Sequence, residues 1–296
     1  MLVIGSVFVD VKGFAREAYK PLERNVGDVQ VAAGGVCRNV AENLRKLGVE
    51  TAFVSMVDDD AFGAQVRDGL AALGVDVAHV IPAPRGMGMW LAILDEKGDL
   101  AGSISRQPDF SALEAYLRRN GDAIMGAADG VALDFDMNAE ITAMVMALAR
   151  KHGKPVYSIV GNMGVILRHP EYLHDVACFI CNEMEAGRLF REELATLGPE
   201  EMLEALKRGS AVAGIPSMVI TMGARGAVYV DNRTGEFGYC PPLEVAVVDT
   251  TGAGDAFFSA AVAALIDGAP LSQAVREGTR LAARTLTVAG SCAEGE

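Results

Sequence analysis

The 296-residue chain has few of the features that mark membrane-spanning or nucleic-acid-binding proteins. It holds 26 lysines and arginines against 39 aspartates and glutamates, and a net charge of −13 argues against a phosphate-backbone partner, which needs a basic surface. Its most apolar long stretch, Ala256 to Ile266, covers 11 residues. That is well short of the ~20 residues that cross a bilayer. We therefore expect neither nucleic acid nor a membrane as a partner.

Cysteine is also scarce, and its five dispersed residues fit a reducing compartment better than a disulfide framework. Cys178 and Cys181 form a CxxC pair, but they lie in an apolar run typical of a strand, where residues three apart point to opposite faces. That geometry disfavours a shared zinc ion. The N-terminus, Met1 to Ser6, lacks the basic residues of a secretory signal, so the predicted location is cytoplasmic.

Strand-like and helix-like segments alternate along most of the chain. Apolar residues at helical spacing between 36 and 47 stop at Gly48, and a second set between 62 and 73 stops at Gly74. The predicted strands include 1–7, 51–56, 156–159, 177–181 and 218–222, and the predicted helices include 138–152 and 200–212. This order predicts an α/β fold of three layers, α/β/α, in which helices cover both faces of a mostly parallel central sheet.

Two strand-rich stretches interrupt the alternation, Asn25 to Ala33 and the hairpin Met87 to Ile104, whose turn is Asp95 to Asp99. We expect them to form a small sheet inserted into one domain that spans residues 1–296. Such a sheet serves either as a lid over the carboxyl ends of the main strands, where α/β folds bind ligands, or as an edge extension for dimerisation.

The segment from Asp249 to Asp255 carries the strongest chemical signal. We expect a strand over Glu244 to Val248, followed by the turn Gly252, Ala253, Gly254 and then a helix that ends near Gly268. A glycine turn that opens a helix directs free backbone N–H groups to one point, and the helix dipole adds positive potential there. The sequence therefore predicts an anion hole built without a cationic side chain.

Other glycine-loop motifs do not fit this segment. A dinucleotide fingerprint needs a third glycine where Phe257 stands, and a P-loop needs a Gly-Lys-Ser/Thr sequence that is absent. Asp255 directly follows the turn, and two interpretations remain open for it. It is either a helix-capping carboxylate or a general base that takes a proton from an incoming hydroxyl group.

The run Asp249-Thr-Thr-Gly-Ala-Gly-Asp255 resembles the signature of the ribokinase-like (PfkB) family of sugar and nucleoside kinases. Further matches occur along the chain in the same order as in the family. One is Val57 to Gly63, where Asp58 occupies a position that is usually glycine. The resemblance implies a ribokinase-like fold with a β-sheet lid and a kinase that uses ATP and Mg²⁺. It gives Asp255 the role of catalytic base and the turn of Gly252, Ala253 and Gly254 the role of anion hole.

The N-terminal match is with the part of the family that binds the phosphate acceptor. Asp10 is similar to the family's substrate-binding aspartate, and Gly34, Gly35 and Asn39 match its Gly-Gly-x-x-x-Asn segment. We place Asp10 at the end of the first strand, where its carboxylate accepts hydrogen bonds from neighbouring sugar hydroxyls. We also expect the lids of two copies to pair in a homodimer, because exposed strand edges need cover.

The nucleotide side is represented by two shorter motifs. Asn182 and Glu185 resemble the family's Asn-x-x-Glu element, with Glu185 acting on Mg²⁺ through water. Thr221, Gly223 and Gly226 resemble its Thr-x-Gly-x-x-Gly nucleotide loop. Taken alone, the first is an acidic helix start and the second is a weak turn signal.

Backbone carbonyls around Asp249 and Thr251, next to the Gly290-Ser291 turn, look like the loops that hold a monovalent cation in many relatives. A K⁺ ion there would order the glycine turn without touching substrate. The same family resemblance therefore predicts K⁺ as a second cation.

Within the family, residues 34–43 and 90–95 look most like pseudouridine kinases. The sequence departs from that group over Ile104 to Asp109, at Ile159 to Asn162 and around Glu277 to Arg280. We expect a kinase that phosphorylates a primary hydroxyl of a ribose-like nucleoside or sugar, with pseudouridine as first candidate. The alternatives are a kinase for a free sugar or another nucleoside, or a catalytically silent nucleotide or sugar sensor.

Overall fold

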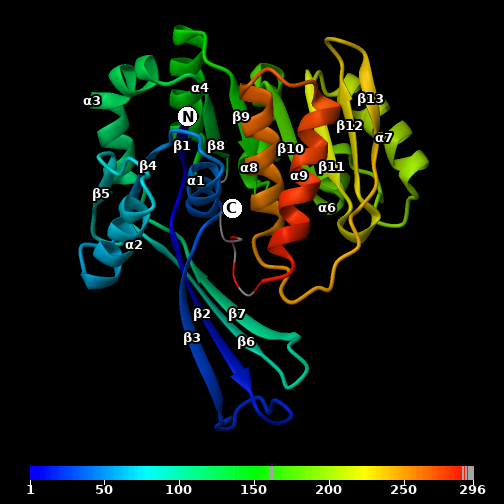
Figure 1. Ribbon diagram of the computed structural model, residues 1–296. Coiled ribbons are helices and arrows are strands. Elements are labelled where there is room, and N and C mark those ends of the chain that lie inside the picture. Colours follow the sequence, from blue (N-terminus) through cyan, green and yellow to red (C-terminus); the bar gives the residue numbers. More distant parts are fainter. Residues whose placement is uncertain (136, 161–162, 289, 291, 293–296) are drawn as a thin grey trace.

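The computed structural model describes residues 1–135, 137–160, 163–288, 290 and 292, which form two separate β-sheets (Figure 1). The main sheet has nine strands in the order β13-β12-β11-β10-β9-β8-β1-β4-β5. Its strands are β1 Leu2–Ile4, β4 Ala52–Val57, β5 Val80–Pro82, β8 Val131–Asp134, β9 Val156–Ile159, β10 Cys178–Asn182, β11 Ser217–Thr221, β12 Ala227–Asp231 and β13 Glu236–Cys240. All pairs from β5 to β11 are parallel, and only β12 and β13 pair antiparallel at one edge. The mostly parallel central sheet is confirmed.

Helices cover both faces of the main sheet and bury two apolar clusters against it. One layer comprises α3 Ser111–Ala127, α4 Ala139–His152, α5 Gly164–Arg168, α6 Glu183–Phe190 and α7 Pro199–Val212. The other comprises α1 Val36–Lys46, α2 Ala61–Ala72, α8 Ala253–Ile266 and α9 Leu271–Thr285. Cys178 belongs to one cluster and Cys181 to the other, so their side chains lie on opposite faces of β10 as predicted. Among the described residues, no helix has the length and apolarity to cross a lipid bilayer.

The predicted helix ends follow local signals in the sequence. Gly48 and Gly74 lie just past α1 and α2 with φ of 84° and 87°, a left-handed conformation that glycine adopts without strain. Asp60 caps α2 by accepting the backbone N–H of Gly63 at 2.8 Å. These caps explain why the helices stop within two residues of the predicted positions.

The second sheet is antiparallel at both edges and projects from one end of the main body (Figure 1). Its order is β3-β2-β6-β7, with β2 Phe8–Ala15, β3 Gly27–Gly34, β6 Gly88–Leu94 and β7 Leu100–Arg106. The two predicted strand-rich stretches supply β3, β6 and β7 outside the main sheet, as expected. The prediction of one strand over 1–7 was wrong, because the chain leaves the main sheet after Ile4 and β2 pairs with β3 and β6 instead.

The two faces of this small sheet differ in chemistry. Side chains alternate along each strand, and directly paired residues share a face. One face, named here the polar face, carries Asp10 and Lys12 of β2, Trp90 of β6 and Ser103 and Ser105 of β7. The opposite face, named here the apolar face, carries Val29 and Val31 of β3, Val11 of β2, Leu91 of β6 and Ile104 of β7.

The strand predicted over Glu244 to Val248 is absent, because this segment pairs with no neighbouring strand. The last two valines of the segment are exposed, with Val247 at 60% and Val248 at 63%. The backbone N–H of Val248 donates to Leu286 O at 2.7 Å, beyond the end of α9. The segment therefore reaches α8 as an extended loop held against the C-terminal helix.

Candidate active site

The predicted glycine turn opens α8, which is the helix that runs through the centre of its layer (Figure 1). Gly252 is the N-cap residue with φ of 77°, and a Cβ added at Gly254 would meet open space. In the described part of the chain, the backbone N–H groups of Gly254 and Asp255 donate no hydrogen bond. The N–H of Ala253 makes a long bond of 3.4 Å to Thr250 O. The first turn of α8 thus leaves backbone donors for an anion, as a helix start does.

Asp255 lies in this first turn and is hydrogen-bonded to Asn39, 216 residues earlier in the sequence. The Nδ2 group of Asn39 donates to Asp255 Oδ2 at 2.6 Å. Burial raises the pKa of Asp255 to about 6, although the bond from Asn39 and the charge of Arg38 oppose the rise. A carboxylate with a pKa near neutrality beside free backbone donors has the properties of a general base.

Arg38 links the groups of this site, and the sequence analysis did not single it out. Its Nη2 donates to Asn39 Oδ1 at 2.5 Å, and its Nη1 pairs with Glu42 Oε2 at 2.8 Å. Its charge opposes the rise in pKa of both Asp10 and Asp255. Only the i,i+4 spacing of Arg38 and Glu42 was readable from sequence, and that spacing is common on exposed helices.

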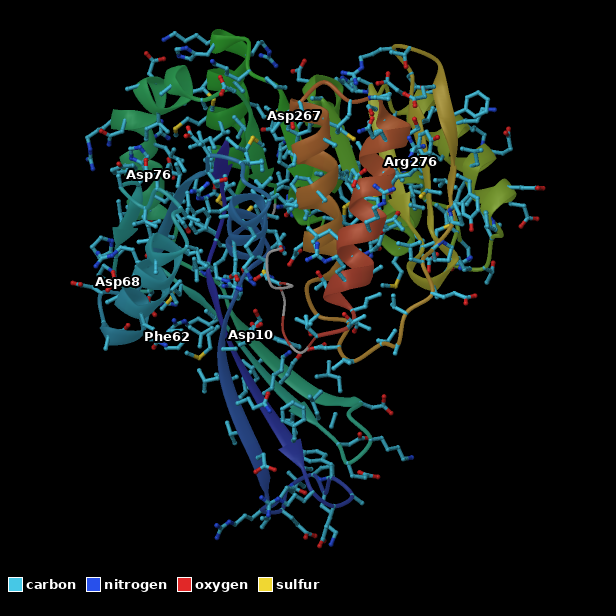
Figure 2. The ribbon with its side chains drawn as sticks, in the orientation of Figure 1. Asp10, Phe62, Asp68, Asp76, Asp267 and Arg276 are labelled. Atoms are coloured by element: carbon cyan, nitrogen blue, oxygen red, sulfur yellow. The ribbon has the colours of Figure 1, made fainter. Side chains whose placement is uncertain are left out.

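Asp10 lies within β2 rather than at the end of the first strand, which corrects the predicted position. It stands where the small sheet leaves the main body (Figure 2). A Cβ at Gly34 would lie 2.4 Å from Asp10 Oδ2, so only glycine leaves room for this carboxylate. Burial raises the pKa of Asp10, against the charges of Lys12 and Arg38. The carboxylate therefore faces the α1 side of the site.

Gly35 precedes α1 and needs to be glycine for two reasons. Its φ is 104°, and a Cβ there would lie 2.6 Å from Ser6 O. This tight passage places Asn39 one turn into α1, where it reaches α8. Asp10, Gly34, Gly35, Asn39 and the turn of Gly252 to Asp255, predicted from distant parts of the sequence, form one connected group through Arg38.

Asn182 and Glu185 begin α6 as a reciprocal capping box. Asn182 Oδ1 accepts the N–H of Glu185 at 2.9 Å, and Glu185 Oε2 accepts the N–H of Asn182 at 2.8 Å. Thr221 is paired with Asn182 in register at the ends of β11 and β10. Since parallel strands end at the same edge of a sheet, these polar residues lie beside one another there.

A short 3₁₀ turn, Gly223–Arg225, follows β11. Gly223 is its first residue, and Gly226 comes directly after it. Both have positive φ, and a Cβ at Gly226 would lie 2.2 Å from Cys240 O of β13. The guanidinium of Arg225 holds the turn by pairing with Glu183 and by donating to Ala195 O at 2.9 Å. Gly226 is thus required by packing, whatever else it contacts.

Asp249 ties the loop before α8 to the end of the chain. Its Oδ1 accepts the N–H of Thr251 at 2.9 Å, and its Oδ2 accepts the N–H of Gly290 at 3.3 Å. Burial would raise the pKa of Asp249, but these N–H donors and Lys12 together lower it. The two segments predicted to hold a cation therefore lie side by side, while Ser291 falls outside the described residues.

The described residues contain no group of three or more His, Cys, Asp or Glu side chains arranged to hold a metal ion directly. Glu185 and Asn182 are the predicted partners of Mg²⁺, and their place at the strand ends fits an ion held mainly by phosphates and water. A cavity of about 1020 Å³ lies elsewhere, along α8 and α9, and none of the predicted site residues lines it.

Comparison with known proteins identifies relatives over nearly the whole chain. The model of the pfkB family carbohydrate kinases matches residues 1–295. A guanosine-inosine kinase from Exiguobacterium acetylicum is 39% identical over 96% of this chain and 93% of its own length. A pseudouridine kinase from Escherichia coli K12 is 28% identical over 93% of this chain and 87% of its own.

Solved structures share the fold. A ribokinase from Arabidopsis thaliana, complexed with ribose and ATP, superposes with a TM-score of 0.85. It is 24% identical, and the match covers 99% of this chain and 95% of that one. The ribokinase-like α/β/α fold predicted from the sequence is confirmed.

Proposed function

Because the chain belongs to the pfkB family of carbohydrate kinases, we propose that it transfers the γ-phosphoryl group of ATP to the primary hydroxyl of a ribonucleoside. The contact that carries this proposal is the 2.6 Å hydrogen bond between Asn39 and Asp255 beside the first turn of α8. This bond places Asn39, which is predicted to bind the acceptor, next to Asp255, whose pKa is raised. Both lie beside the backbone N–H groups of the first turn of α8.

In this mechanism Asp255 takes the proton of the acceptor hydroxyl as its oxygen attacks the γ-phosphorus. The bond from the γ-phosphorus to the bridging oxygen of ADP breaks, and ADP leaves with that electron pair. The N–H groups of Gly254 and Asp255 stabilise the charge on the transferring group, and no residue is covalently modified. Asp10 and Asn39 hold the sugar hydroxyls so that the primary hydroxyl points at Asp255.

The phosphoryl donor lies on the strand-end side, against Asn182, Thr221 and the turn of Gly223 and Gly226. Glu185 and Asn182 would hold Mg²⁺ through water, and the ion would supply positive charge to neutralise the phosphates. Arg225 holds the turn after β11 through Glu183 and Ala195 O, and the turn's outer surface would take the nucleotide.

A nucleoside acceptor is favoured by the 39% identity to a guanosine-inosine kinase and the 28% identity to a pseudouridine kinase. ADP release should be measured with guanosine, inosine, pseudouridine, adenosine, ribose and fructose. We expect the highest kcat/KM with guanosine or inosine. Turnover of ribose or fructose with no nucleoside turned over would contradict the nucleoside proposal. Binding of ATP and nucleoside without ADP release would instead identify a sensor.

We propose that the small sheet is a lid that pairs with a second copy of the chain. Four side chains of its apolar face are exposed, with Val29 at 70%, Val31 at 56%, Leu91 at 37% and Ile104 at 70%. Such a patch, on a sheet with two open edge strands, needs a cover.

We expect Ile104→Asp to shift the protein from dimer to monomer in sedimentation velocity at micromolar concentration. A buried carboxylate at a dimer contact costs free energy unless it is paired. Ser103→Asp is the matched control, since Ser103 is its neighbour on the polar face. A monomeric wild type, or a dimer that tolerates Ile104→Asp, would contradict the proposal.

We also propose that K⁺ binds backbone carbonyls around Asp249 and Thr251. A cation there would fix the loop that leads into the glycine turn, so kcat should fall when K⁺ is replaced by tetramethylammonium at equal ionic strength. Equal activity in the two buffers would count against the site.

A further inference from the structure

Trp90 stands beside Asp10 on the polar face of the small sheet. Asp10 pairs with Trp90 across β2 and β6, and Trp90 pairs with Ser105 across β6 and β7. Neighbouring strands lie about 4.7–4.9 Å apart, and residues paired across them point to the same face. The three side chains therefore form a row that starts at the residue assigned to the sugar hydroxyls.

The polar face is the one that looks toward the candidate active site. Lys12, one alternation along β2 from Asp10, lowers the pKa of Asp249 in the loop before α8. Arg38 of α1 opposes the rise in the pKa of Asp10. Two parts of the main body, helix α1 and the loop before α8, therefore lie close to charged side chains of the polar face. The indole of Trp90 shares that face.

The row continues into polar groups on the edge strand. Gln107 follows β7, and its Nε2 donates to Ser105 Oγ at 3.3 Å. Ser105 and Gln107 are exposed, and Trp90 is partly exposed. An aromatic ring flanked by an amide and a hydroxyl suits a planar heterocycle, which stacks on the ring and hydrogen-bonds through its edge.

The geometry of a nucleoside matches this row. The base of a nucleoside is attached at the carbon next to the one that carries the 2′-hydroxyl. The base therefore lies a short distance to one side of the group that holds the vicinal hydroxyls, comparable to the ~4.8 Å between neighbouring strands. Trp90 is one strand away from Asp10. A free pentose has no group to occupy that position.

We propose that Trp90 is the stacking platform for the nucleobase of the acceptor, with Ser105 and Gln107 contacting the edge of the base. This inference rests on the proposed function and deepens it, because it separates nucleosides from free sugars. It also gives a role to the stretch Ile104 to Asp109, where the sequence departs from pseudouridine kinases.

Trp90 is the only tryptophan of the chain, so its emission reports on this position alone. We expect guanosine to quench the tryptophan fluorescence of the wild type in a saturable manner, and ribose at the same concentration to leave it unchanged. Trp90→Leu should raise KM for guanosine by about 5- to 150-fold, the range expected for loss of one base–aromatic stack. Trp90→Phe should restore most of the affinity, and KM for ATP should not change.

Leu91→Ala is the matched control, because Leu91 is the next residue on β6 and points to the apolar face. Equal loss of affinity in Trp90→Leu and Leu91→Ala, or a rise in KM for ATP with Trp90→Leu alone, would show that Trp90 only supports the sheet and would overturn the proposal. Thermal melting of both variants reports any unfolding.

Base stacking on Trp90 and phosphoryl transfer to nucleosides can be tested separately. Nucleoside turnover without quenching would overturn the stacking platform and leave the proposed function standing. Quenching by nucleosides without any phosphorylation would support the platform and overturn the kinase activity on nucleosides. Gln107→Ala adds a third readout, since loss of an edge contact should change the KM ratio of guanosine to inosine, which differ at one edge group. An unchanged ratio would remove Gln107 from the subsite.

Discussion

Asp255→Asn is expected to lower kcat by about 10²- to 10⁴-fold, the usual contribution of a general base. Asparagine keeps the shape of the side chain and its hydrogen bond to Asn39, after rotation of the amide, but it cannot take a proton. The backbone donors of the first turn of α8 are unchanged, so the affinity for ATP should hold. The measurement is steady-state kinetics with ADP release as the readout, together with a direct binding assay for ATP.

Asp267→Asn provides the matched control for this experiment. Asp267 caps the opposite end of the same helix, far from Asp10 and the small sheet (Figure 2). It should leave kcat unchanged. Near-wild-type turnover of Asp255→Asn would show that Asp255 is only a helix-capping residue. Loss of ATP binding in parallel with activity would instead indicate a collapsed anion hole.

The pH dependence follows from the raised pKa of Asp255. Since the pKa lies at about 6, the base is deprotonated at pH 8 and becomes protonated as the pH falls, so kcat/KM should drop about tenfold per pH unit below 6. A raised carboxyl pKa also means that the folded state favours the protonated form. The associated stability is present at low pH and is lost as the pH rises through 6. At pH 8, Asp255→Asn should therefore melt no lower than the wild type.

The alternation of strands and helices and the ends of the first two helices could be predicted, because these depend on local periodicity and on glycines such as Gly48 and Gly74. The glycine turn at the start of α8 was equally readable, since the left-handed N-cap position of Gly252 favours glycine, and glycine at Gly254 leaves the first turn open to an anion. The small sheet was found except for β2. Only Gly5 and Ser6 and the buried Val7 separate β1 from β2, and apolar residues on both sides of them give the pattern of one continuous strand.

The remaining misses have physical causes of the same kind. Residues 244–248 have the apolar, β-branched composition of a strand, but their segment bonds to the end of α9 through Val248 instead of to a strand. Arg38 was missed because its part in the site depends on Asp255, which its charge affects and its partner Asn39 contacts, and a single sequence carries no signal that Asp255 lies close to α1. Family resemblance assigned Asp10 to the acceptor site, which stays a prediction, and its strand was assigned to the wrong sheet.

Asp10→Ala is expected to lower kcat/KM for the nucleoside by about 30- to 900-fold, equivalent to about 2–4 kcal/mol of transition-state binding. The carboxylate would accept hydrogen bonds from two vicinal hydroxyls, and its removal leaves both without a charged partner. KM for ATP should be unchanged. Gly34→Ala tests the same contact indirectly, because its new Cβ would lie 2.4 Å from Asp10 Oδ2 and would displace the carboxylate.

The decisive comparison uses 2′-deoxyguanosine beside guanosine. The wild type should discriminate strongly against the deoxynucleoside, which lacks one of the two hydroxyls that Asp10 holds. Asp10→Ala should lose most of that discrimination, since a missing hydroxyl no longer costs a bond to a charged group. If Asp10→Ala weakens the reaction with both nucleosides by the same factor, the carboxylate does not contact the 2′-hydroxyl. The substitution would then act through Arg38, whose charge also affects the pKa of Asp255. In that case the pH profile of kcat/KM would shift in the variant.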